Sequence, residues 1–214
     1  MTLDATFQIG SKKIANGSLP YVIAEAGSNF NQSLDTAKRL IDVAAAAEAD
    51  AVKFQLFQAD ILYPDRGKIY DIFKSIELDA NWIPVLKKHA EDQDLAFLAS
   101  AFDPGSLEVL EEAGVLAFKV ASSETTNFSL LYQMASKNKP MIIATGMCDM
   151  VDVEEAVNIC AAAGNHSVAL LQCGSMYPLP SELVNLRVME KFRTRFGCPV
   201  GFSDHTLGIN AATA

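Results

Sequence analysis

The sequence predicts an α/β protein whose parallel strands form a TIM-type (β/α)8 barrel. Short apolar runs alternate with amphipathic helical segments along the chain. Nearly every apolar run ends in polar or ionisable residues, as in the stretch from Phe118 to Glu124, which reads FKVASSE. Because the carboxyl ends of the strands of such a barrel meet on one face, we expect these polar residues to form one site there.

Seven strands are predicted as continuous apolar runs, which are typical of a parallel sheet buried on both faces. Their expected ranges are 21–26, 51–57, 95–99, 115–120, 140–144, 168–172 and 198–202. A β-hairpin is predicted within residues 1–18, where apolar residues alternate around Gly10 and Ser11, and we expect it to close the bottom of the barrel. We expect a barrel that is incomplete at its C-terminal end, with the first and seventh strands left without an eighth between them.

Helices are predicted from the residues that begin and end them. Ser33, Asp103 before Pro104, Asn127 and Asp152 mark helix starts. Glycines end three helices, at Gly114, Gly164 and Gly197, and the last of these helices is expected to include Leu183 and Leu186. Residues 60–78 are predicted to be a long connection, followed by a helix with Pro84 near its start.

The alternative fold is an open doubly wound sheet. The first strand lacks a following GxGxxG sequence, and polar groups follow every strand instead of gathering at one switch point. Both observations favour the barrel.

The bulk composition is that of one soluble globular domain spanning residues 1–214. A net charge of -9 argues against nucleic acid as a partner. The four cysteines lack CxxC spacing and are predicted to be buried free thiols, which suits a cytoplasmic protein. We find neither a signal peptide nor an apolar run long enough to cross a membrane.

Lys53 and Lys119 carry the sharpest functional signal, since each lies in an apolar strand and lysine is rarely buried without a partner. One interpretation is two structural salt bridges, with Glu25 and Glu124. The interpretation that we favour is an anion-binding pair of lysines, assisted by hydroxyl groups that can donate to phosphate oxygens. Those hydroxyls belong to Ser100, Ser122 and Ser203. A Schiff-base lysine is a third possibility.

His205 follows the seventh strand, next to Asp204. This position suits either a metal ligand or an acid–base group. Glu25 ends the first strand and is a candidate general base or hydroxyl acceptor.

An ordered set of short motifs resembles the sialic acid (N-acetylneuraminate) synthase family, which includes legionaminate, pseudaminate and spore-coat polysaccharide synthases. The matching stretches are IAEAG at 23–27 with Asn29, AVKFQ at 51–55, Ser100 with Phe102, FKVAS at 118–122 with Glu124, TGM at 145–147, Cys173 with Tyr177-Pro178, and GFSDHT at 201–206.

The resemblance implies a barrel enzyme that condenses phosphoenolpyruvate with an N-acetylated amino sugar such as N-acetylmannosamine and releases phosphate. It implies that Lys53, Lys119, Ser122 and Ser203 bind phosphoenolpyruvate, and that Glu25, Gln55 and Tyr177 face the sugar. It further implies that Glu124 acts near the reacting atoms, with Glu25, Glu124 and Lys119 as the catalytic group. His205 would bind a divalent metal, Mn²⁺ or else Mg²⁺ or Co²⁺. We expect a homodimer.

The chain departs from the family at several positions. Phe30 and Gln32 stand where the family has histidine and glycine, Ala144 stands in place of a serine, and Ser175 stands in place of an asparagine. A second histidine ligand and the C-terminal antifreeze-like domain of the family are expected to be absent. Two other functions therefore stay open: a non-catalytic phosphate-binding or assembly module, and an aldolase-type lyase that uses a Schiff base.

Overall fold

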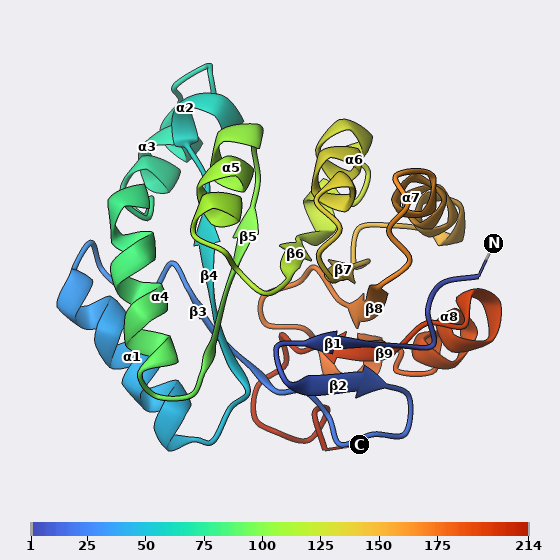
Figure 1. Ribbon diagram of the computed structural model, residues 1–214. Coiled ribbons are helices and arrows are strands. Elements are labelled where there is room, and N and C mark those ends of the chain that lie inside the picture. Colours follow the sequence, from blue (N-terminus) through green and yellow to red (C-terminus); the bar gives the residue numbers. More distant parts are fainter. Residues whose placement is uncertain (1, 214) are drawn as a thin grey trace. The chain divides into compact units, whose positions relative to one another are not determined.

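The protein is an α/β fold with seven parallel strands and an N-terminal antiparallel hairpin, described here by a computed structural model over residues 2–213 (Figure 1). The seven strands follow one another in the sheet in chain order, from β3 to β9. The predicted fold class is therefore confirmed, and β3 and β9 are the two ends of the strand order among the described residues.

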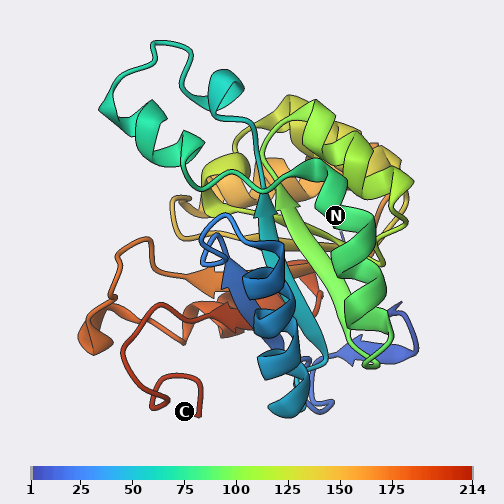
Figure 2. The same cartoon turned by 90° about the vertical axis from the view of Figure 1, so that its left-hand side faces the viewer.

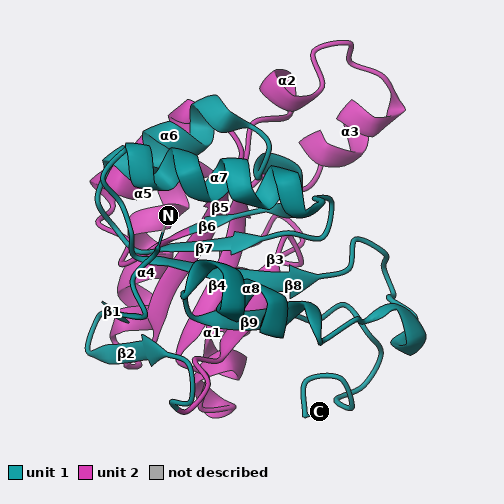
Figure 3. Cartoon of the chain, turned by 90° about the vertical axis from the view of Figure 1, so that its right-hand side faces the viewer, with its two compact units in different colours: residues 1–18, 119–214 teal, residues 19–118 magenta. Residues whose placement is uncertain are grey.

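The chain divides into two compact units (Figure 3). The middle unit comprises residues 19–118, and the hairpin unit comprises residues 1–18 together with 119–214. Each unit is described by itself below. The prediction of a single domain stays a prediction.

The middle unit places helices against three parallel strands. Its elements are β3 (Ile23–Gly27), α1 (Leu34–Ala46), β4 (Ala51–Leu56), α2 (Ala59–Leu62), α3 (Lys68–Lys74), the 3₁₀ turn η1 (Ala80–Trp82), α4 (Ile83–Glu91), β5 (Ala96–Ala101) and α5 (Pro104–Glu112). Helices α1 and α4 pack side by side (Figure 2). Ser33 and Asp103 cap α1 and α5 as predicted, because their side chains accept hydrogen bonds from the N–H groups of Thr36 and Ser106.

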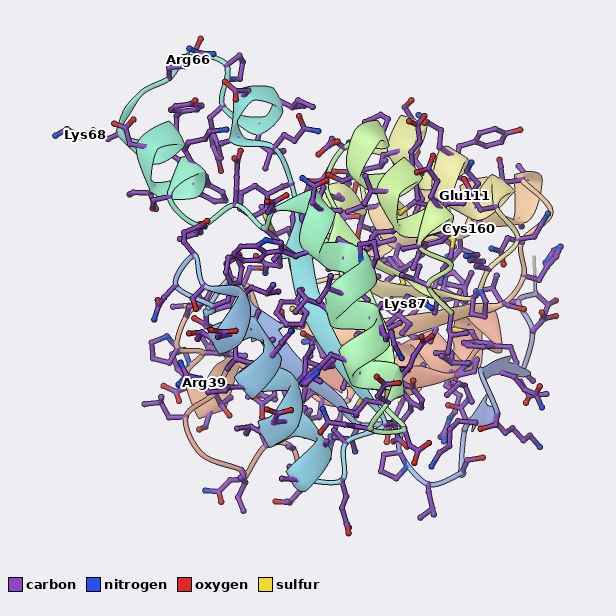
Figure 4. The ribbon with its side chains drawn as sticks, turned by 60° about the vertical axis from the view of Figure 1, so that its left-hand side comes forward. Arg39, Arg66, Lys68, Lys87, Glu111 and Cys160 are labelled. Carbon is purple, nitrogen blue, oxygen red and sulfur yellow. The ribbon has the colours of Figure 1, made fainter. Side chains whose placement is uncertain are left out.

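Residues 59–79 form an excursion beyond the carboxyl end of β4, where the sequence predicts only a long connection over residues 60–78. It contains α2 and α3 around a cluster of aromatic rings, in which Phe73 contacts both Phe57 and Tyr63. Arg66 and Lys68 lie at its outer tip (Figure 4). Helices of four and seven residues are too short to show an apolar period in the sequence.

The hairpin unit combines the hairpin with the last four strands. Its elements are β1 (Thr6–Ile9), β2 (Lys12–Ala15), β6 (Phe118–Val120), whose first residue falls in the middle unit, the 3₁₀ turn η2 (Ser122–Glu124), α6 (Phe128–Ser136), β7 (Met141–Ala144), α7 (Met150–Ala162), β8 (Val168–Cys173), the 3₁₀ turn η3 (Ser181–Leu183), α8 (Val188–Phe196) and β9 (Val200–Ser203). Helices α6 and α7 pack side by side (Figure 3).

The hairpin is attached at the amino-terminal end of β9. The side-chain amide of Asn16 donates to the carbonyl of Cys198 at 2.8 Å, and its oxygen accepts from the N–H of Val200 at 3.2 Å. The N–H of Leu3 also donates to the carbonyl of Phe196. Within this unit the hairpin therefore lies at the end opposite to the strand-end loops, as predicted.

Two predicted helix starts are wrong. Helix α7 begins at Met150, because Asp149 is its N-cap and Asp152 instead completes a capping box at the third helical position. Helix α8 begins at Val188, so Leu183 and Leu186 precede it. Asn185 explains the late start, since its φ of 52° lies in the left-handed region, which an α-helix cannot contain.

No helix among residues 2–213 combines the length and apolar character needed to cross a membrane.

Candidate functional site

In the middle unit, strand register brings four predicted residues onto one face. Glu25 of β3 pairs in register with Lys53 of β4, and Gln55 pairs with Ser100 of β5. Parallel partners share a face of the sheet, and residues two apart on a strand share it as well. Glu25 and Lys53 therefore form one row in the middle of their strands, and Gln55 and Ser100 form the next row, near the carboxyl ends.

The opposite face of this sheet is apolar and fixes the orientation of the polar one. Phe54 and Phe97 belong to it, and their rings stack with centroids 5.7 Å apart. Both rings are fully buried. A slip of β4 by one residue would bury Lys53 and Gln55 in this layer, so the register is strongly determined.

Lys53 is 8% exposed and forms an ion pair with the carboxylate of Glu25, whose side chain is 48% exposed. The structural salt bridge considered from the sequence is thus present for this pair. It is compatible with anion binding, because an ammonium group has three donors and one carboxylate does not use them all.

In the hairpin unit, Ser203 faces away from the helices. The register pairs Ser203 of β9 with Cys173 of β8, and Leu171 with Ala144 of β7, so these residues share one face. Met141 lies on the other face of β7, where its sulfur is 3.9 Å from that of Cys160 on α7. Ser203 therefore lies on the same face as Ala144, the residue for which the resemblance implies a serine.

Lys119, Ser122 and Glu124 lie along β6 and the turn after it. Lys119 is 6% exposed, and its ammonium donates to the carbonyl of Val120 at 2.7 Å. The Ser122 hydroxyl accepts the N–H of Gly146 at 3.0 Å. The Glu124 carboxylate accepts from the side-chain amide of Asn127 at 3.0 Å.

His205 is oriented by the loop that follows β8. Its Nδ1 lies 2.6 Å from the carbonyl oxygen of Gly174. A carbonyl only accepts, so Nδ1 carries the hydrogen and the neutral ring keeps its lone pair on Nε2. The ring also lies on that of Tyr177, with centroids 4.1 Å apart. Tyr177 and His205 are thereby brought together, as a candidate sugar contact and a candidate metal ligand.

The sequence predicts no role for the residues that hold these loops in place, although Thr145 lies in one of the matching motifs. Thr125 and Thr145 are buried, and their hydroxyls donate to the carbonyls of Ala144 and Leu171. Gly174 has no room for a side chain, because an added Cβ would lie 2.5 Å from a methyl of Leu179. Thr145 and Gly174 directly follow β7 and β8, and this position was the available signal for them, whereas Thr125 lies five residues beyond β6.

No group of three or more His, Cys, Asp or Glu side chains within residues 2–213 is arranged to hold a metal ion. His205 contributes one imidazole nitrogen, and divalent metals need several ligands. The described residues therefore do not make a complete metal site.

All four cysteines are free thiols, as predicted, but the predicted burial is wrong for Cys148, which is partly exposed, while Cys160, Cys173 and Cys198 are buried. Burial raises the pKa of Cys160 to about 12 and that of Cys198 to about 11. Because the thiolate is the nucleophile, neither is suited to catalysis near neutral pH.

Comparison with known proteins decides the family. The NeuB family model matches residues 40–214. The chain belongs to the NeuB family. The resemblance drawn from the strand-end motifs is confirmed.

Relatives of this NeuB-family chain include the spore coat polysaccharide biosynthesis protein SpsE of Bacillus subtilis, 39% identical over 94% of the chain and 57% of the relative. The N,N'-diacetyllegionaminic acid synthase of Legionella pneumophila is 36% identical over 96% of the chain and 65% of the relative. The chain thus spans about three fifths of the length of these curated relatives.

Solved structures give the same answer. The N-acetylneuraminic acid synthetase of Leptospira borgpetersenii has a TM-score of 0.92 and 30% identity, and the match covers 98% of this chain and 73% of that one. The SpsE structure has a TM-score of 0.85 and 40% identity, covering 94% and 57%.

The departures from the family pattern near β3 have local explanations in this chain. Phe30, at the histidine position, is fully buried with its ring edge-on to Trp82. Gln32, at the glycine position, has a φ of 53°, in the region that favours glycine. Its side-chain amide donates to the carbonyl of Glu77 at 2.7 Å, which offsets part of that strain.

Proposed function

We propose that this NeuB-family chain belongs to a synthase that condenses phosphoenolpyruvate with an N-acetylated amino sugar to form a nonulosonic, sialic-type acid. The relatives named as acid synthases support the reaction class. The observation that carries the proposal for this chain is a buried lysine in each unit, Lys53 and Lys119, on a strand that ends in polar residues. Buried ammonium groups are suited to bind the phosphate and carboxylate of phosphoenolpyruvate.

The proposed roles follow the geometry of each unit. In the middle unit, Lys53 and Ser100 donate to the anionic substrate, while Glu25 and Gln55 accept and donate hydrogen bonds to sugar hydroxyls. In the hairpin unit, Lys119, Ser122 and Ser203 donate to phosphoenolpyruvate, and the exposed ring of Tyr177 contacts the sugar. Glu124 is held by Asn127 and acts near the reacting atoms.

The reaction forms one carbon–carbon bond and one carbon–oxygen bond to water, and it breaks the carbon–oxygen bond to phosphate. The methylene carbon of phosphoenolpyruvate attacks the aldehyde carbon of the open-chain sugar, and the aldehyde oxygen takes up a proton. Water adds to the neighbouring carbon of the former enol phosphate and loses a proton, which balances the proton taken up by the aldehyde oxygen. That carbon then releases inorganic phosphate, which takes the remaining hydroxyl proton, and becomes the ketone. Lysine ammonium groups stabilise the phosphate through both steps.

The divalent metal predicted from the resemblance is proposed at His205 alone, with Nε2 as the available ligand atom. When bound, such a metal would polarise the sugar aldehyde. One nitrogen is not a complete ligand set, so no step is assigned to it. We expect weak Mn²⁺ binding that His205→Ala reduces, while His166→Ala is a matched control. Equal Mn²⁺ binding by the His205→Ala variant and the parent would show that the metal assignment is wrong.

The lysine assignment is tested by calorimetric titration with phosphoenolpyruvate. We expect Lys119→Ala, and Lys53→Ala likewise, to weaken binding by about 2–4 kcal/mol, because a buried charge-assisted interaction is lost. Lys88→Ala, on the exposed surface of α4, is the control and should bind as the parent does. Unchanged affinity in both buried-lysine variants would contradict the proposal.

A Schiff-base lyase would form an imine on a lysine, whereas a lysine that binds an anion forms none. Borohydride treatment with pyruvate should therefore leave the chain unmodified. A homodimer and a cytoplasmic location remain predictions from the sequence.

A further inference from the structure

The turn that follows β7 is hydrogen-bonded to both neighbouring strand ends of the hairpin unit. On one side, Thr125 Oγ1 donates to the carbonyl of Ala144 at 2.7 Å, and Ser122 Oγ accepts from the N–H of Gly146 at 3.0 Å. On the other side, Thr145 donates to the carbonyl of Leu171 from its hydroxyl and from its N–H, at 3.0 and 3.2 Å. Neither threonine is more than 5% exposed.

The bond from Gly146 fixes what the Ser122 hydroxyl can do. A hydroxyl has one hydrogen and two lone pairs, and the N–H of Gly146 occupies a lone pair. The hydrogen of Ser122 must therefore point away from Gly146. A serine held in this way is oriented in advance as a donor, which is the role that binding an anion requires.

Gly146 is restricted to glycine by space and not by its backbone angles. An added Cβ would lie 2.7 Å from the hydroxyl oxygen of Ser175 and 2.8 Å from the carbonyl oxygen of Cys173. The second atom belongs to the backbone and cannot rotate away. A side chain at position 146 would therefore push the turn off the end of β8 and displace the N–H that Ser122 accepts.

We propose that Gly146 is a positioning residue that orients the Ser122 hydroxyl as a donor to phosphoenolpyruvate, and that Thr125 and Thr145 hold Gly146 in place. The inference rests on the proposed function and deepens it, because it assigns roles to three residues that do not contact the substrate. These three residues act through Ser122 and not through general stability.

A double-mutant cycle tests this mode of action by calorimetric titration with phosphoenolpyruvate. Gly146→Ala should weaken binding about tenfold in the parent chain, the effect of losing one hydrogen bond to a charged group. In the Ser122→Ala background the same change should weaken binding by less than about twofold, since the two residues act as one unit. In the Ser122→Thr background, which keeps a hydroxyl, sensitivity to Gly146→Ala should return.

Two controls separate positioning from folding. Gly67→Ala adds a methyl at a glycine with ordinary φ of -85° and nothing within 4 Å, and should bind as the parent does. Thr125→Val keeps shape while removing the hydroxyl that holds the turn, so it tests the proposal even if Gly146→Ala does not fold. It should weaken binding about threefold to tenfold. Thr194→Val removes a comparable hydroxyl from exposed α8 and should have no effect.

The outcomes are distinguishable. Equal losses from Gly146→Ala in the parent and Ser122→Ala backgrounds would overturn the inference, as would parent-like binding by a folded Thr125→Val variant. If the parent itself binds no phosphoenolpyruvate, the proposed function fails and this inference fails with it.

Discussion

The two units present their candidate residues in different ways. In the middle unit the polar groups stand on the strands themselves, and the register of β3, β4 and β5 fixes Glu25, Lys53, Gln55 and Ser100. In the hairpin unit most of them stand on turns beyond the strands. There, hydrogen bonds between neighbouring turns take over the role of register.

This difference has a physical consequence for how each unit tolerates change. A side chain on a strand is held by the whole sheet, so a substitution there disturbs charge and solvation more than geometry. A side chain on a turn is held by a few hydrogen bonds and close backbone contacts, so a single added methyl can displace it.

All four cysteines also lie in the hairpin unit, at positions 148, 160, 173 and 198.

The largest expected effect concerns the buried thiols of Cys160 and Cys198. Burial raises the pKa of Cys160 to about 12 and of Cys198 to about 11, while an unfolded cysteine titrates near 8.5. The unfolded chain therefore loses these protons first, so stability is full below about pH 8.5 and falls as the pH rises toward 11 and 12. We expect a loss of about 2 kcal/mol per thiol at pH 10.

Urea unfolding at pH 7 and pH 10 measures this loss. The Cys160→Ala variant should lose about 2 kcal/mol less than the parent between the two pH values. An unchanged pH dependence in that variant would contradict the assignment of the loss to the buried thiol.

The next effect concerns the ion pair of the middle unit. Glu25→Gln leaves the ammonium of buried Lys53 without its carboxylate and should lower the free energy of unfolding by about 1–2 kcal/mol. Lys53→Met should cost less, because the half-exposed Glu25 can be hydrated by water. Urea unfolding of both variants measures the asymmetry, and an equal or reversed order would refute it. Lys88→Met, which breaks an exposed pair with Asp92, should cause no measurable change.

Gly174 offers the matching test in the hairpin unit. A Cβ at this position would lie 2.5 and 2.6 Å from the two methyls of Leu179, so Gly174→Ala should lower stability by about 1–2 kcal/mol. The cost should shrink in a Leu179→Ala background, where the methyls are absent. Thermal unfolding against the Gly67→Ala control measures it. Identical stability of the two glycine variants would show that the turn yields more easily than its contacts indicate.

The smallest expected effect is at Gln32. Gln32→Gly would relieve the strain of a φ of 53°, but it would lose the hydrogen bond to Glu77 and make the unfolded chain more flexible. These contributions oppose one another, and we expect a net change of less than about 0.5 kcal/mol. A stability gain well above this in urea unfolding would mean that the hydrogen bond contributes little.

The sequence by itself determined the alternation of strands and helices, the hairpin, and the polar face of the middle unit. These follow from the periodicity of apolar residues and from single polar residues within apolar runs, such as Lys53 and Lys119. A lysine in an apolar run needs a partner for its charge in any fold. The caps at Ser33 and Asp103 were equally local. The family could also be identified this way, because its motifs lie at those same strand ends.

Only the tertiary structure decided which groups hold the turns of the hairpin unit. The bond between Ser122 and Gly146 joins residues 24 positions apart, and that between His205 and the carbonyl of Gly174 joins residues 31 apart. In each of these bonds a side chain is paired with a backbone group, and since every residue carries such a group, the sequence does not show which one the side chain will bond. The late start of α8 and the short helices of residues 59–79 could not be predicted for a related reason. The first depends on one left-handed residue and the second on one aromatic cluster, and neither produces a periodic pattern of apolar residues in the sequence.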